Sequence, residues 1–174
     1  IANVIRYNDE YLNNYYRTQL SEQSKLGQQL DGLKDLASIL NDLEGTGIDG
    51  ALSDFYEALN NLNEYPASST ARINFIETAK TLTSTMNSKY QQLQENTTKA
   101  LGDGVSQESL ENSKIYVQYR ELNNKLEELA SVNKALITTQ TGTLEANNLL
   151  DKRDLILNEI AEFTDIKLFL IHIS

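Results

Sequence analysis

Apolar side chains recur at steps of three and four residues along most of this 174-residue chain. The most regular run alternates steps of four and three: Ile115, Tyr119, Leu122, Leu126, Leu129, Asn133 and Leu136. A period near 3.5 residues is typical of helices that pack together along one apolar stripe. Asn133 is the polar member of this stripe, and such an asparagine is expected to fix the register of the pairing. The spacing therefore predicts a mainly α chain.

Few residues interrupt the pattern, because proline occurs once, at Pro66, and most of the eight glycines lie near breaks. Long amphipathic helices joined by short connections favour an elongated antiparallel bundle. We expect this helical domain to occupy residues 1–165. Breaks are expected at 43–50, 65–66, 102–104 and 138–143, and the predicted helices cover 8–42, 51–62, 72–100, 115–136 and 145–164.

The end of the chain, residues 166–174, has a different composition, with Ile, Leu and Phe crowded together. Two interpretations stay open for this segment. It is either a short β segment that begins a β-rich region, or a non-native tail.

Charge and residue usage exclude several classes of function. The chain has 25 acidic and 15 basic side chains and a formal charge of −10, which argues against nucleic acid and against a polybasic contact with membranes. Cysteine is absent and His172 is the single histidine, so we expect no zinc or other metal site, no catalytic thiol and no imidazole-based triad. No apolar run reaches the roughly 18 residues of a membrane span. No cofactor is expected.

The start of the chain lacks the basic and apolar regions of a cleavable signal peptide. It also lacks an initiator Met, and we expect the sequence to be a piece of a longer protein.

Neighbouring carboxylates such as Glu127 and Glu128 are the nearest approach to catalytic chemistry. General acid–base work needs one carboxyl group in a dry pocket, whereas these pairs fall on polar helix faces. The densest charge cluster is Asp151-Lys152-Arg153-Asp154. Arg153 is expected to pair with a carboxylate on a neighbouring helix as a structural clamp. No catalytic residue is expected.

Two segments resemble motifs of the flagellar hook-associated protein 1 family, the hook–filament junction proteins. The first runs from Gly50 through Phe55-Tyr56 to Pro66 and Arg72, and the second is Asn148-Leu149-Leu150-Asp151-Lys152-Arg153-Asp154. The opening helix, with Arg17-Thr18-Gln19-Leu20, is similar to the family's first bundle helix. The motif residues are Gly50, Leu52, Ser53, Phe55, Tyr56, Pro66, Arg72, Asn148, Leu149, Leu150, Asp151, Arg153 and Asp154.

The resemblance implies a structural protein without catalysis, found outside the cell in the bacterial flagellum. Copies of such a protein form a ring at the junction between hook and filament, against the hook protein and the adjacent junction protein. Export proceeds through the flagellar type III apparatus without a cleaved signal peptide. An export chaperone would bind through terminal segments missing here, which also form the inner core of the assembly.

A stand-alone helical-bundle binding module, or a type III-secreted adaptor or effector, is the alternative. A stable dimer of this chain at micromolar concentration would favour it, with the 115–136 stripe as the contact.

Overall fold

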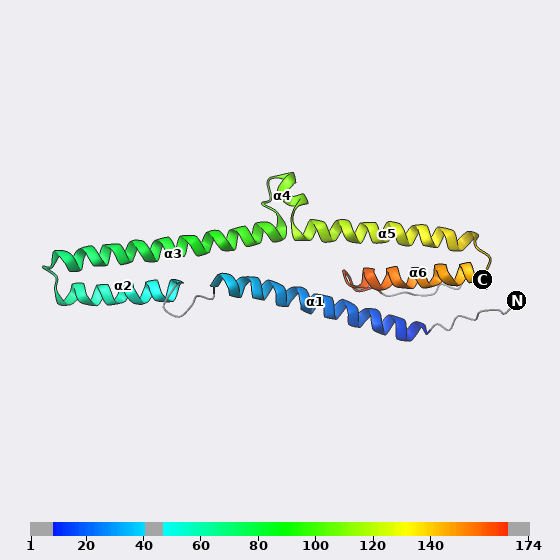
Figure 1. The fold of residues 1–174 in the computed structure, drawn as a ribbon, viewed down its shortest axis with the longest axis horizontal. Coiled ribbons are helices and arrows are strands. Elements are labelled where there is room, and N and C mark those ends of the chain that lie inside the picture. Colours follow the sequence, from blue (N-terminus) through cyan, green and yellow to red (C-terminus); the bar gives the residue numbers. More distant parts are fainter. Residues whose placement is uncertain (1–8, 41–46, 167–174) are drawn as a thin grey trace. The chain divides into compact units, whose positions relative to one another are not determined.

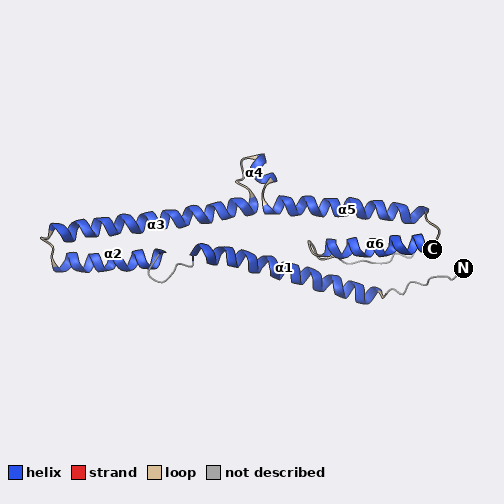
Figure 2. Ribbon diagram, in the orientation of Figure 1, coloured by secondary structure: helices blue, strands red, loops and turns tan. Residues whose placement is uncertain are grey.

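A computed structural model of the chain describes residues 9–40 and 47–166. Within these ranges the backbone forms six α-helices and no strand (Figures 1 and 2). The mainly α prediction is confirmed, while most of the predicted β segment, residues 167–174, lies outside the described residues. The helices are α1 (Glu10–Leu40), α2 (Gly47–Glu64), α3 (Ser69–Leu101), α4 (Gln107–Glu111), α5 (Lys114–Thr138) and α6 (Leu144–Ala161).

Side-chain caps begin three of these helices. Ser68, Ser106 and Thr143 each accept a hydrogen bond from a backbone N–H three residues later, at 3.3, 3.1 and 3.1 Å. Such caps satisfy donors that the first helical turn leaves without a carbonyl partner. They fix where α3, α4 and α6 start.

Helix α4 does not correspond to any segment of the apolar pattern. It is stabilised by local polar contacts. Asp103 Oδ1 accepts hydrogen bonds from the backbone N–H groups of Ser106 at 2.8 Å and Val105 at 2.9 Å. These bonds lower the pKa of Asp103. Gly102 ends α3 at φ 83°, and a Cβ there would lie 3.0 Å from Leu110 Cα, so the tight connection requires glycine.

The chain divides into two compact units. The α5–α6 unit comprises residues 1–30 and 114–174, and the α2–α3 unit comprises residues 31–113. Helix α1 contributes its first part to one unit and its last turns to the other.

In the α5–α6 unit, two antiparallel helices enclose a small apolar core. Val132, Ile156 and Ile160 are buried at its centre. Partly buried apolar residues pack around them: Leu122, Leu129, Leu136, Leu149 and Ile166. Burial of this contiguous set is the main favourable term that holds the hairpin together.

The predicted 115–136 stripe is half right. Leu122, Leu129 and Leu136 do face the core, but Leu126 is 45% exposed and Asn133 is exposed. The intervening core position belongs to Val132. On a helix, the residue three positions after Leu129 lies on nearly the same face as the residue four positions after it. The periodicity alone did not decide between them, and Asn133 has no register role in this hairpin.

In the α2–α3 unit, small residues occupy the contact between the two helices. Ala51 and Ala58 of α2 and Ala71 of α3 are buried, so the two backbones can approach closely. The rings of Phe55 and Phe75 meet beside them, with centroids 5.2 Å apart. The arrangement is an antiparallel hairpin closed by the turn at 65–68 (Figure 1).

Candidate functional site

The Pro66–Arg72 part of the first motif closes the turn between α2 and α3. Arg72 donates from Nε and Nη2 to the carbonyl oxygen of Pro66, at 3.0 and 2.8 Å. The same turn carries the Ser68 cap, whose hydroxyl oxygen accepts from Ala71 N–H. An arginine suits this place because its planar fork offers two donors to one acceptor. These residues fix the geometry of the hairpin.

The α2 part of the first motif divides between two faces. Phe55 is half-buried and contacts Phe75 of α3, and Gly50 is half-buried. Leu52, Ser53 and Tyr56 are exposed. The motif therefore combines residues that hold α2 to α3 with residues left on the surface.

Ala58 and Ala71, which are buried in the contact between α2 and α3, were not among the site residues predicted from the sequence. The sequence signal for the α2 side of this contact was the spacing of Ala51 and Ala58, which are seven residues apart and therefore on one helix face.

In the second motif, Asp154 of α6 pairs with Arg17 of α1. Arg17 Nη2 lies 3.3 Å from Asp154 Oδ1, and Arg17 Nε donates to Asn158 Oδ1 at 3.0 Å. The Arg17 side chain is only 3% exposed. Burial lowers the pKa of Arg17, and Asp154 opposes that shift.

Arg17 was not among the predicted site residues. The available signal was a lone basic residue among tyrosines and asparagines near the start of α1.

The other charged members of the second motif face different directions. Lys152 Nζ lies 2.9 Å from Glu128 Oε1 on α5, and the hydrogen bond lowers the pKa of Glu128. Arg153 Nη2 lies 3.9 Å from Asp154 of its own helix, and Arg153 Nε is buried with no hydrogen-bond partner in the described structure. The interhelical ion pairs described for this motif are thus made by Lys152 and Asp154, and not by Arg153 as the sequence pattern predicted.

The remaining motif residues are placed around the hairpin core. Leu149 packs against it, Leu150 is half-buried, and Asn148 and Asp151 are exposed. A further ion pair joins Lys125 of α5 to Glu159 of α6 at 2.8 Å. The second motif therefore joins α6 to both α1 and α5.

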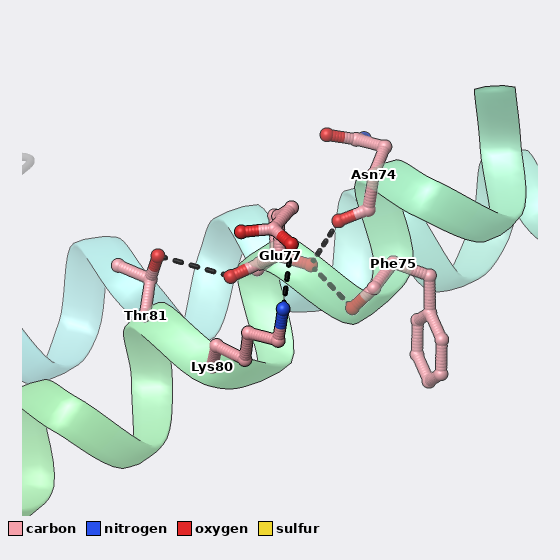
Figure 3. Close-up of polar contacts among 6 residues, drawn as sticks. Asn74, Phe75, Glu77, Lys80 and Thr81 are labelled. Atoms are coloured by element: carbon pink, nitrogen blue, oxygen red, sulfur yellow. Dashed lines mark hydrogen bonds and ion pairs between the residues drawn. The ribbon is translucent and has the colours of Figure 1, made fainter.

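Several polar side chains on the surface of α3 bond to groups of the same helix. Figure 3 shows Lys80 paired with Glu77 at 2.8 Å and Thr81 donating to the Glu77 carbonyl oxygen. Thr78 donates to the carbonyl oxygens of Asn74 and Phe75.

The clefts are shallow and polar. One lies between α1 and the turn that follows α6, and is lined by residues such as Ser21, Lys25 and Asp165. Across the described residues, no three acidic or histidine side chains cluster closely enough to hold a metal ion. No helix in the described ranges is long and apolar enough to cross a membrane.

Paired helices, a locked turn and charged bridges between helices define a helical structural protein. The sequence model described as "Flagellar hook-associated protein FlgK helical domain" matches residues 33–170, and the chain belongs to this family of structural proteins of the bacterial flagellum.

Flagellar hook-associated protein 1 of Bacillus subtilis (strain 168) is similar to the chain, with 24% identity over 164 residues. The match covers 94% of this chain but only 30% of that relative. No solved structure matches the chain.

Proposed function

We propose that the chain is the helical part of a protein that forms the junction between the hook and the filament of the flagellum, without catalysis. The observation that best supports this proposal is that the two sequence motifs lie inside the segment that the family model matches. Both motifs, at 50–72 and 148–154, lie within residues 33–170, which the hook-associated family model matches.

The placement of the motif residues fits a structural role. Arg72 holds the α2–α3 turn through two hydrogen bonds, and Asp154 and Lys152 join α6 to α1 and α5. A subunit between two different helical lattices must keep its helices from sliding past one another. Charged bridges across helix pairs oppose such sliding because they are directional.

The proposed partners follow from the same role. They are other copies of the protein in a ring, the hook protein and the adjacent junction protein. Export by the flagellar type III apparatus would deliver the protein to the cell exterior, with a chaperone bound through segments beyond this chain. Exposed tyrosines on α1 offer contact area to neighbours: Tyr11, Tyr15 and Tyr16.

Deletion of the full gene in the source organism tests the proposal. We expect bare hooks by electron microscopy and flagellin released into the medium, because filaments would lack an attachment point. Reintroduction of the intact gene is the control and should restore filaments. Normal filaments in the deletion strain would contradict the junction role.

A stand-alone helical binding module, or a type III-secreted adaptor or effector, is the second candidate. It is favoured by an exposed apolar stripe on α1, formed by Leu26, Leu30, Leu33 and Leu40. Sedimentation at micromolar concentration separates the two. A monomer agrees with a fragment of a junction protein, and a stable dimer favours the binding module.

A further inference from the structure

No residue of helix α1 belongs to the apolar cluster around Val132, Ile156 and Ile160 in the α5–α6 unit. Every described residue of that core comes from α5, α6 or Ile166. Most large apolar side chains of α1 in this unit are exposed, including Leu26 at 59% and Leu30 at 52%, while Leu20 is half-buried. The cluster between α5 and α6 therefore forms without a residue of α1.

A single buried side chain, Arg17, makes the described polar link between α1 and α6. It is the one buried residue of α1, and it reaches Asp154 and Asn158, one turn apart on α6. The cleft beside it is lined by later residues of α1 and the turn after α6, so α1 and α6 run in the same direction.

The polar contact around Arg17 is incomplete within the protein. Asn14 Oδ1, one turn before Arg17, and Arg153 Nε, next to Asp154, are both buried with no hydrogen-bond partner among the described residues. A buried charge pair is costly to desolvate, and its best-attested role is to fix a register between helices. Each buried polar group left without a partner carries a desolvation cost, which reduces the net stability of the contact between α1 and α6.

We propose that the first part of α1 is a separable arm of the α5–α6 hairpin, held in register by Arg17 through Asp154 and Asn158. The arm leaves the hairpin while α5 and α6 stay folded, because the cluster around Val132, Ile156 and Ile160 is formed by residues of α5, α6 and Ile166 and none of α1. The proposal concerns this chain alone and stands independently of the flagellar role.

Amide hydrogen exchange read by mass spectrometry tests the proposal on the whole chain and on Arg17→Met, which keeps the apolar stem and removes the charge. Residues 12–30 should exchange about tenfold to about a hundredfold faster in the variant, because one partner of a buried pair is lost. Exchange across α5 and α6 should stay unchanged. Lys25→Met is the matched control: Lys25 is exposed and pairs only with Glu22 in its own helix at 3.4 Å, so its loss should leave α1 protected.

Two results would overturn the proposal. Unchanged exchange of residues 12–30 in Arg17→Met would show that Arg17 does not hold the arm. Equal loss of protection in α1, α5 and α6 would show that α1 is part of one cooperative unit.

Asp154→Asn is a second variant that tests the same contact in case Arg17→Met fails to fold. It keeps the size of the side chain and a carbonyl acceptor for Arg17, so it should release α1 by a smaller factor with circular dichroism unchanged. If Asp154→Asn leaves the exchange of residues 12–30 as it is in the original chain, the charge pair is not the holding contact and the proposal fails.

Discussion

Arg72 shows how one exposed side chain can define a turn. Its two donors meet the Pro66 carbonyl oxygen at 3.0 and 2.8 Å. Arg72→Ala should therefore lower the free energy of unfolding by about 1 kcal/mol, the usual net value of such hydrogen bonds. Urea titration of the purified chain measures this. Lys80→Ala is the control, because the exposed Lys80–Glu77 pair should contribute less, about 0–0.5 kcal/mol. Equal losses would show that Arg72 acts only as a surface charge.

Ile156 is a core residue, whereas Leu126 matches the apolar spacing of its helix without being buried. Ile156 is 2% exposed inside the hairpin core, whereas Leu126 is 45% exposed. Ile156→Ala should cost about 2–5 kcal/mol, because it leaves a cavity. Leu126→Ala should cost below about 1 kcal/mol, because surface substitutions do little. Thermal unfolding of both variants tests this, and a larger loss at Leu126 would contradict the arrangement of α5.

At the scale of helices, the α5–α6 hairpin carries a dependence on pH through Glu128. The hydrogen bond from Lys152 lowers the pKa of Glu128 below its ordinary value of 4.5. The folded state therefore gains stability from this carboxylate above pH 4.5, and loses it as the pH falls through the lower folded-state pKa.

Glu128→Gln should lower the melting temperature at neutral pH and have little effect in strong acid. Thermal scans across the acidic range measure the difference. Glu127→Gln, on the exposed side of the same helix, is the matched control and should leave the pH dependence as it is. A parallel shift at every pH in Glu128→Gln would mean that the Lys152 contact is not the source.

Three element boundaries followed the sequence closely, whereas the predicted break at 43–50 was wrong from residue 47 on, because α2 already begins at Gly47. The break at Pro66, the glycines at 102–104 and the threonine-rich segment before Thr143 all separate helices in the structure. Helix α4 was not predicted, because its five residues are too few to show a period. It depends on hydrogen bonds that the side chains of Asp103 and Ser106 accept from backbone N–H groups, which spacing does not reveal.

For the whole molecule, the extent of the helical domain is open to a direct test. We proposed that it ends at residue 165, and Ile166 packs against the α5–α6 core. A chain that ends at residue 165 should melt lower than one that ends at Ile166, by an amount equivalent to about 1–2 kcal/mol for a partly buried isoleucine.

Ile166→Ala in the whole chain is the control, because it removes the same contact without removing the tail. Identical melting of both truncated chains would place the end of the domain before Ile166.

The sequence alone determined the mainly α architecture, the main breaks and the family motifs. Each of these depends on local spacing or on residues close together in the chain, as in the 50–72 segment. Tertiary structure decided which members of each stripe are buried, and in α5 the buried position belongs to Val132 and not to Asn133. It also brought Arg17 into contact with Asp154, 137 positions away in the sequence. The physical reason is that a helix offers several faces within one turn. Only the packing of a second helix determines which face of the first helix is buried. It also determines which charged side chain is buried with that face.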